Sequence, residues 1–303
     1  MRIRTINEYD HLQSVLLGSV KNGAWPTNDV FFDMMIESST YKNSLTKGPL
    51  SQAVIDHTEQ ELEYLQNILL KRGVEVIRPN TAQPHCAFSA RDVLLTLDNK
   101  VILCPTPYTS RQNEKTLYEH LQIKFGEWVK LPMPRHENSP MFDAANICKF
   151  NDKLLYLVSK TANLAGAKLL QSVVGTAFEV IPWRGVYSHA HIDSTIVSLD
   201  QNTILLNGSR VNETNLPKFL RDYKKIYLTD IEERDFDKFP YASKWIGMNI
   251  LSLDPETVVV DPFYKKLIAL LQDNNYNVIE APLTHARTIG GGWHCVTCDL
   301  ERT

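Results

Sequence analysis

The sequence predicts an α/β fold built from five ββαβ-like modules around a common axis. Two observations carry this prediction: four segments of one pattern recur about every fifty residues, and the two chain ends can supply a fifth copy. Each segment has an apolar strand, a short turn rich in Asp or Asn, and a second apolar strand, which is typical of a β-hairpin. The four segments are residues 92–105, 146–159, 194–209 and 248–262.

Three of the four hairpins are followed by an amphipathic stretch and a further strand. These pairs are residues 164–175 with 177–183, 216–224 with 225–231, and 263–275 with 276–283. Residues 55–73 also predict a helix, because Leu62, Leu65 and Leu69 recur at helical spacing, and a strand over 74–79 follows it. The helix and its strand therefore belong to a fifth module.

That fifth module lacks a hairpin, since residues 12–19 form a single strand. The segment WHCVTCDL at 293–300 is the candidate partner, because pairing the last strand with the first closes a ring and removes exposed sheet edges. We expect one domain over residues 1–303. Residues 21–50 fit no module and are expected to form a long loop, either a surface excursion, an oligomer contact or an active-site lid.

The composition is that of a globular protein, with 43% hydrophobic and 22% charged residues. A formal net charge of -3 and scattered Lys and Arg residues make nucleic acid an unexpected partner. No apolar run approaches the roughly 20 residues of a membrane-spanning helix, and the N-terminus lacks the apolar stretch of a signal peptide. We therefore expect a cytoplasmic protein without a membrane partner, and an odd number of five cysteines agrees with a reducing compartment.

Two cysteines near the C-terminus, Cys295 and Cys298, are three residues apart. If 293–300 is a strand, their side chains point to opposite faces, so they form neither a metal pair nor a disulfide. A structural zinc site would also need further ligands of similar spacing. The glycines at 290–292 allow close approach just before Cys295, which makes Cys295 the nucleophile candidate and Cys298 a buried apolar thiol.

Polar residues stand just before the repeated hairpins, at equivalent module positions. A histidine there is more often part of a packed core, and an acid there is usually a turn or cap residue. The recurrence of such residues in successive modules instead favours a shared site at one end of the axis. They are Asp92, Asp143, His191, Asp193 and Ser243.

The charges of these residues suggest a substrate. Several carboxylates around a thiol raise its pKa above the free value of about 8.5 unless a cation enters. A planar guanidinium supplies that charge, donates hydrogen bonds to carboxylates along its edges and presents its central carbon to the sulfur. The sequence thus predicts a guanidino substrate.

At these residues the sequence resembles the amidinotransferases, the glycine and inosamine-phosphate type, within the guanidino-modifying enzymes that also include arginine deiminase. The resemblance covers nearly the whole chain. Its motifs are NEYDHLQSVLLGS near the start, ARD at 90–92, FDAAN at 142–146, HID at 191–193, SKWIGMNILSLD at 243–254 and GGGWHCVTCDLER at 290–302. It implies a five-bladed α/β propeller of pseudo-fivefold symmetry, the pentein fold.

The resemblance also implies roles for individual residues. Cys295 matches the nucleophile, His191 the general acid and base, and Asp143 the acid that holds this histidine. Asp92 and Asp193 match the guanidinium-binding carboxylates. Arg210 matches the arginine that binds the donor's α-carboxylate, and Ser243 a serine that contacts the donor. The sequence departs from the pattern at Asn146, at Ala242 and in the YSHA run before His191, so glycine is not assumed as the acceptor.

These roles imply transfer of an amidino group from L-arginine to an acceptor amine, with ornithine released. The rival enzyme would be a hydrolase resembling arginine deiminase, which would yield citrulline and ammonia with the same residues. A third hypothesis is a guanidino-compound binding protein without activity. We expect small-molecule substrates, no metal and no organic cofactor; a homo-oligomer is compatible with the sequence, and His189 is equally suited to the pocket and to the surface.

Overall fold

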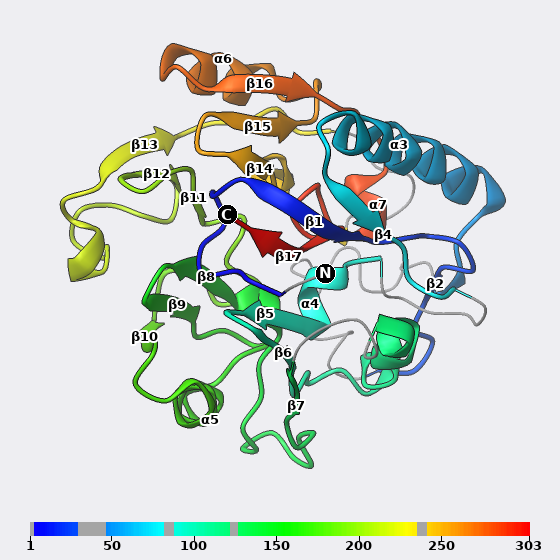
Figure 1. Cartoon of the computed structure of the whole chain (residues 1–303), viewed down its shortest axis with the longest axis vertical. Helices are drawn as coiled ribbons and strands as arrows, with labels where there is room; N and C mark the ends of the chain where they lie inside the picture. Colours follow the sequence, from blue (N-terminus) through cyan, green and yellow to red (C-terminus); the bar gives the residue numbers. More distant parts are fainter. Residues whose placement is uncertain (1–2, 30–46, 82–87, 122–126, 235–240) are drawn as a thin grey trace.

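The protein is described by a computed structural model over residues 3–29, 47–81, 88–121, 127–234 and 241–303. Within these residues there are five three-stranded sheets and one two-stranded sheet. Figure 1 shows the three-stranded sheets following one another around the molecule, with both chain ends near its middle.

Four of the three-stranded sheets come from consecutive stretches of chain and share one strand pattern. The first two strands form an antiparallel hairpin, and the third pairs in parallel with the second. The hairpins predicted from the turn chemistry are therefore confirmed. The strands are β5 (Leu94–Leu97), β6 (Lys100–Leu103) and β7 (Glu127–Lys130); β8 (Ile147–Phe150), β9 (Lys153–Leu157) and β10 (Glu179–Trp183); β11 (Ile196–Ser198), β12 (Thr203–Asn207) and β13 (Lys224–Leu228); β14 (Leu251–Asp254), β15 (Thr257–Val260) and β16 (Asn277–Glu280).

The fifth sheet joins the two ends of the chain. Strand β17 (Thr297–Arg302) pairs antiparallel with β1 (Leu12–Leu17), and β1 pairs in parallel with β4 (Glu75–Ile77). Its strand pattern is the same as in the other four sheets, with β17 in the place of the first hairpin strand. The predicted pairing of the last strand with the first is confirmed.

Three longer helices cover three of the four predicted amphipathic stretches. They are α3 (Gln52–Lys71), α5 (Leu164–Val174) and α6 (Lys265–Asp273). Helix α3 starts at Ser51, whose hydroxyl accepts a hydrogen bond from Val54 N–H, and it buries Leu62, Leu65 and Leu69 completely. The helical periodicity in this stretch therefore marks the face that packs inward.

Two stretches differ from the sequence prediction. Residues 216–224 form only a 3-10 turn, η4 (Lys218–Leu220), since fewer than two α-helical turns of chain separate Pro217 from β13. After β6, where no helix or third strand is predicted, the chain forms η1 (Thr109–Arg111), η2 (Glu114–Leu121) and β7. The second module is thus completed by a 3-10 helix.

The predicted strand over 293–300 begins four residues late. Residues 293–296 form a turn in which Val296 N–H donates to Gly292 O at 3.1 Å and Thr297 N–H donates to His294 O at 3.3 Å. Cys295 therefore lies in this turn, and the alternation argument that placed it on the opposite face of a strand from Cys298 was wrong. Both cysteines are free thiols nevertheless.

The ends of the predicted 21–50 loop are joined. The short strands β2 (Ala24–Trp25) and β3 (Gly48–Pro49) pair antiparallel, and the loop interior, residues 30–46, lies outside the described residues. Four of the five first strands are preceded by a short helical segment. These are α4 (Ala90–Val93), η3 (Ala144–Asn146), η5 (Lys244–Met248) and, before the turn that leads to β17, α7 (Ala286–Ile289), while β11 follows a loop.

None of the helices in the described parts is both long and apolar enough to cross a membrane.

Candidate active site

Five short segments, one before each first hairpin strand, bring polar side chains together. Asp92 comes from α4, Asp143 from the start of η3, and His191 with Asp193 from the loop before β11. Asn249 follows η5 and Cys295 lies in the turn before β17. The contacts described below link residues from all five sheets, as equivalent positions in a repeated fold would predict.

Cys295 is buried, with 2% of its surface exposed, and its side chain is held from two sides. Its Sγ donates to Asp193 Oδ2 at 3.1 Å and accepts from Asn249 Nδ2 at 3.1 Å. Its backbone N–H donates to Asn249 Oδ1 at 2.8 Å. Gly291 packs directly against it, since a Cβ at that position would lie 2.7 Å from Cys295 Cβ.

The thiol of Cys295 is kept protonated by its surroundings. Burial is the largest cause that raises its pKa well above the ordinary value, and the negative charges of Asp193 and Asp92 add to it. The hydrogen bond from Asn249 works in the opposite direction. A cation placed between these carboxylates would favour the thiolate, as the sequence argument expected.

His191 is oriented by two carboxylates. Its Nε2 lies 3.1 Å from Asp143 Oδ2, and its Nδ1 lies 3.9 Å from Asp92 Oδ1. Burial alone would lower the pKa of His191, but the charges of Asp92 and Asp143 and the hydrogen bond with Asp143 outweigh it and raise the pKa to about 9. Its φ of 52° is a left-handed conformation that costs energy for a non-glycine residue and is typical of functional sites.

Asp92 has one engaged and one open oxygen. Arg111 Nη1 donates to Asp92 Oδ2 at 2.6 Å, while the Nε of Arg111 donates to Glu114. Among the described residues, no hydrogen-bond donor reaches Asp92 Oδ1, although this atom is buried. Because a buried carboxylate oxygen without a donor is unfavourable, Oδ1 is a natural acceptor for a ligand.

The reactive atoms of Asp92, His191 and Cys295 all lie within 4.8 Å of one another. This spacing places a thiol, an imidazole and a carboxylate around one small volume, which makes the cluster a candidate active site. Of the described residues, these three are also the ones whose donor atoms lie close enough together to hold a metal ion.

Asp193 touches both Cys295 and a neighbour that the sequence argument did not select. His294 Nδ1 lies 3.3 Å from the same Oδ2 atom that accepts from the thiol. Burial would raise the pKa of Asp193, but the hydrogen bond and the charge of His294 lower it to about 2. Asp193 is therefore an anion over the whole physiological pH range.

Arg210 and Ser243 have other contacts. Arg210 Nη1 donates to Ser194 O at 3.0 Å and to Thr195 Oγ1 at 3.0 Å, and its guanidinium lies over the Tyr187 ring at 3.6 Å. Ser243 is the N-cap of η5, and its hydroxyl accepts from Trp245 N–H. Arg210 borders the loop of His191 and Asp193. The contacts of Arg210 and Ser243 with the donor substrate stay predictions.

Two further positions from the sequence argument have local roles in the described contacts. Asn146 is fully buried, donates to Leu157 O at 3.2 Å and accepts from Thr161 Oγ1 at 2.8 Å, which ties η3 to the end of β9. His189 is partly exposed, and its ring lies 5.8 Å from that of Tyr187. Neither contact places these residues on Cys295.

No protein-family model matches the chain. Inosamine-phosphate amidinotransferase 1 of Streptomyces griseus is 36% identical over 335 residues, and the alignment covers 98% of this chain and 96% of that protein. The chain belongs to the amidinotransferase family. The resemblance inferred from the sequence motifs is thereby confirmed. A second amidinotransferase, the L-arginine:L-lysine amidinotransferase of Pseudomonas savastanoi pv. phaseolicola, is 25% identical over 97% of this chain and 93% of that protein.

Solved structures agree with the membership in the amidinotransferase family. An inosamine-phosphate amidinotransferase from Streptomyces griseus superposes with a TM-score of 0.93 at 36% identity, covering 99% of this chain and 97% of that one. The N-terminal domain of a cyanobacterial arginine dihydrolase superposes with a TM-score of 0.73 at 13% identity over 95% and 98% of the two chains, which shows a shared fold alone. Both likenesses are consistent with the α/β pentein fold.

The sequence argument missed three polar neighbours of this cluster: Asn249, Arg111 and His294. Asn249 sits inside the conspicuous SKWIGMNILSLD motif, six residues after Ser243, so the equivalence of module positions could have selected it. Arg111 lies in the stretch after β6 where no element was predicted. His294 and Cys295 both contact Asp193 Oδ2 from a turn, whereas in the predicted strand neighbouring side chains would point to opposite faces.

Proposed function

We propose that this amidinotransferase moves the amidino group of L-arginine to an acceptor amine through a covalent intermediate on Cys295, with ornithine as the first product. The observation that carries the proposal is the set of contacts that joins Cys295, Asp193, His191 and Asp92 around one point. The amino acid named first for the Pseudomonas relative, L-arginine, supports the choice of donor.

In this proposal two carboxylates bind the guanidinium of arginine. Asp92 offers its open Oδ1, and Asp193 offers a carboxylate that stays ionised because of His294. Planar guanidinium groups pair well with carboxylates on more than one edge. Arg210 would bind the α-carboxylate of arginine and Ser243 would contact the same end of the molecule.

The first half-reaction forms a carbon–sulfur bond and breaks a carbon–nitrogen bond. The bound guanidinium lowers the thiol pKa, the thiol loses its proton to solvent, and the thiolate attacks the central carbon. His191, protonated because its pKa is about 9, gives its proton to the departing nitrogen of ornithine. The enzyme is left with a cationic S-amidino group and a neutral imidazole.

The second half-reaction reverses these steps with another amine. The acceptor attacks the amidino carbon, His191 takes the proton that the new nitrogen loses, and Cys295 leaves as a thiolate. Asp143 would keep the imidazole aimed at both amines. Water must stay away from the intermediate, because its attack would release urea.

We also infer that the five sheets form the blades of a five-bladed propeller within one domain over residues 1–303. The common strand pattern and the contribution of each blade to one cluster support this arrangement. The cluster would then lie at one end of the propeller axis, where the segments before the first strands converge.

Product analysis tests the transferase against the hydrolase. Purified protein is incubated with L-arginine alone and with a panel of amines, including inosamine phosphates and L-lysine. Ornithine that forms in proportion to an added amine supports transfer. Citrulline and ammonia without any amine would establish the hydrolase instead.

Mass spectrometry tests the intermediate. After incubation with arginine and no acceptor, the wild-type mass should increase by one amidino group, and Cys295→Ala should stay unmodified. An unmodified wild type that binds arginine tightly would favour a binding protein without activity.

A further inference from the structure

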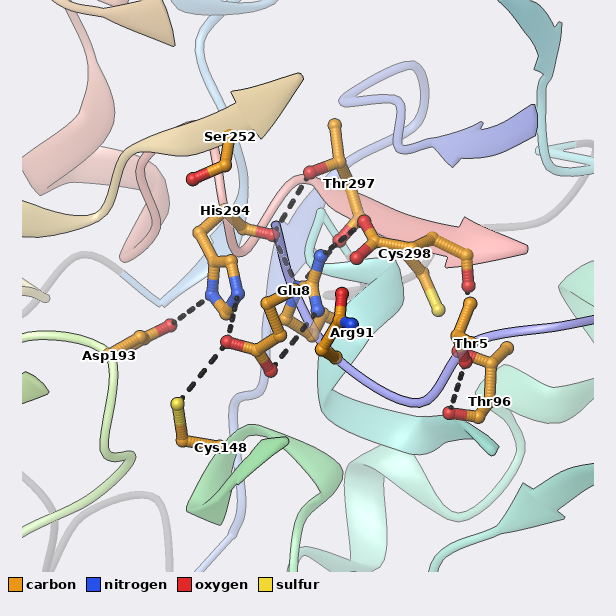
Figure 2. Close-up of polar contacts among 12 residues, drawn as sticks. Thr5, Glu8, Arg91, Thr96, Cys148, Asp193, Ser252, His294, Thr297 and Cys298 are labelled. Carbon is orange, nitrogen blue, oxygen red and sulfur yellow. Dashed lines mark hydrogen bonds and ion pairs between the residues drawn. The ribbon is translucent and has the colours of Figure 1, made fainter. Parts of the chain in front are cut away.

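His294 lies between the buried carboxylates of Asp193 and Glu8, next to Cys295 in the chain. Its Nδ1 is 3.3 Å from Asp193 Oδ2, and its Nε2 is 3.5 Å from Glu8 Oε2. All three residues are at least nine-tenths buried. Figure 2 shows the imidazole between Asp193 and Glu8, with Cys148 beyond Glu8.

The chemistry of imidazole limits how this arrangement can be satisfied. A neutral ring has one N–H donor and one lone pair, so one of the two carboxylates would face the lone pair. Only the imidazolium presents an N–H to each carboxylate, in the contact with Asp193 at 3.3 Å and in the 3.5 Å ion pair with Glu8, which lacks hydrogen-bond geometry. Two carboxylates next to one buried ring therefore favour a positive charge on His294, in contact with Asp193 Oδ2.

Glu8 is itself tied to the rest of the core. Its Oε1 lies 4.0 Å from Arg91 Nη1, and its Oε2 accepts from Cys148 Sγ at 3.4 Å. Arg91 in turn pairs with Asp299 on β17 at 2.8 Å. His294 is thus linked through Glu8 to a network that spans β8, α4 and β17, and its position is not set by Asp193 alone.

We propose that His294 is a positioning residue for the guanidinium donor: it holds Asp193 as an oriented anion so that the carboxylate can bind the substrate beside Cys295. This inference rests on the proposed function, because it assigns a role within the same site. Asp193 Oδ2 is engaged by both His294 and the thiol, so the interaction with His294 determines where its other oxygen, Oδ1, can reach.

Two substitutions of equal polarity separate this role from mere packing. In His294→Asn the amide nitrogen can take the place of Nδ1 and donate to Asp193, whereas in His294→Gln the amide reaches toward Glu8 and leaves Asp193 without its donor. We expect His294→Gln to raise the arginine KM by about 10- to 100-fold, the range for a lost hydrogen bond to a buried charge, with a smaller change in kcat. His294→Asn should raise the arginine KM several-fold less than His294→Gln does.

Binding without chemistry gives a second readout. Calorimetric titration of L-arginine into Cys295→Ser, and into Cys295→Ser combined with either His294 substitution, should give dissociation constants in the same order as the KM values. Glu8→Gln, which changes the far side of His294 without touching Asp193, should raise the arginine KM in the same direction and by less than His294→Gln. Cys148→Ala serves as a control from the same network and should leave the arginine KM within about two-fold.

The outcomes separate the inference from the function on which it rests. Equal arginine KM values for His294→Asn, His294→Gln and the wild type, with ornithine still formed, overturn the role of His294 alone. Loss of thermal stability without a difference between the two variants does the same, because a purely structural histidine would respond in that way. A wild-type protein that neither binds arginine nor forms ornithine overturns the proposed function and this inference together.

Discussion

Asn249 holds Cys295 at two atoms, with its Oδ1 accepting from the backbone N–H at 2.8 Å and its Nδ2 donating to Sγ at 3.1 Å. The hydrogen bond from the Asn249 amide to the sulfur lowers the thiol pKa and so opposes the effect of burial. It also fixes the backbone of the turn at residues 293–296. Asn249 therefore combines orientation of the thiol with stabilisation of a developing thiolate.

Replacing Asn249 should slow the first half-reaction. Asn249→Ala removes the donor to sulfur, and we expect kcat for ornithine release to fall by about 10²- to 10³-fold, as for other donors aimed at a developing anion. Asn249→Asp should be worse still, because a carboxylate beside Sγ raises the thiol pKa further. Single-turnover assays with arginine measure the effect.

The matching control is alkylation of Cys295 by iodoacetamide without arginine. Its rate at a given pH should fall from wild type to Asn249→Ala to Asn249→Asp. A rate that rises in the aspartate variant would show that the amide does not stabilise the thiolate.

The fold could be largely predicted because its information is local. Turn residues and β-branched flanks mark each hairpin, and a single unpaired strand at 12–19 forces a partner from the C-terminus. The stretch between β6 and β7 could not be read in this way, since a 3-10 helix has no strong periodicity of its own. The late start of β17 depends on turn hydrogen bonds for which the sequence of residues 293–300 gives no recognisable signal.

The candidate site could be predicted only in part for a related reason. Asp92, Asp143, His191 and Asp193 occupy equivalent places in successive repeats, so periodicity pointed to them, and the structure brings all four together with Cys295. Glu8 and His294 are nearly the whole chain apart in sequence, and only tertiary packing places them against each other. No spacing rule connects such a pair.

Asp92→Asn should have opposite effects on binding and on the thiol. The arginine KM should rise by about 10-fold or more, because a charged acceptor for the guanidinium is lost. Alkylation of Cys295 in the absence of arginine should become faster at a given pH, since the charge of Asp92 is one of the causes that raise the thiol pKa. Arginine saturation curves and iodoacetamide rates check the two effects.

Asp98→Asn is the control for this substitution. Asp98 lies in the turn between β5 and β6, in the same sheet, with a φ of 51° that asparagine also tolerates. The arginine KM and the alkylation rate of Cys295 should both stay at the wild-type values. Slower alkylation in Asp92→Asn would contradict the electrostatic account of the thiol.

The pKa of His191 predicts how the reaction depends on pH. As the general acid, His191 must be protonated, so ornithine release in a single turnover should decline as the pH rises through about 9. Asp143→Asn removes one cause of the raised pKa and should move this decline to lower pH. A decline at the same pH in both proteins would show that another group controls it.

The same shift has a consequence for stability. Because the pKa of His191 is raised in the folded state, its protonation stabilises the fold fully below the unfolded value of about 6.5, and this contribution is lost as the pH rises through about 9. Asp143→Asn should therefore destabilise the protein more at pH 6 than at pH 10. Thermal unfolding of both proteins at the two pH values measures the difference.

Arg302 should be one of the residues on which the closure of the fold depends. Its Nε donates to Asp299 Oδ2 at 2.8 Å, and its Nη2 donates to Ser252 O at 2.7 Å, which links β17 to β14. Both side chains of the ion pair are at most 2% exposed, so Arg302→Ala would leave the Asp299 carboxylate buried without this partner. We expect a loss of about 3–5 kcal/mol in the free energy of unfolding, measured by denaturant titration.

An exposed ion pair provides the comparison for Arg302. Lys265 and Glu280 lie 3.3 Å apart with side chains 68% and 48% exposed, and Lys265→Ala should leave the denaturation midpoint unchanged because solvent screens such pairs. Burial would raise the pKa of Asp299, but the charges of Arg302 and Arg91 outweigh it and lower this pKa. The ionised Asp299 therefore stabilises the fold above the unfolded pKa of about 3.9, and this contribution is lost in acid. The stability loss in Arg302→Ala should accordingly become smaller as the pH falls. A deficit that is constant with pH would mean that packing of the arginine stem, and not its charge, joins the last strand to its neighbours.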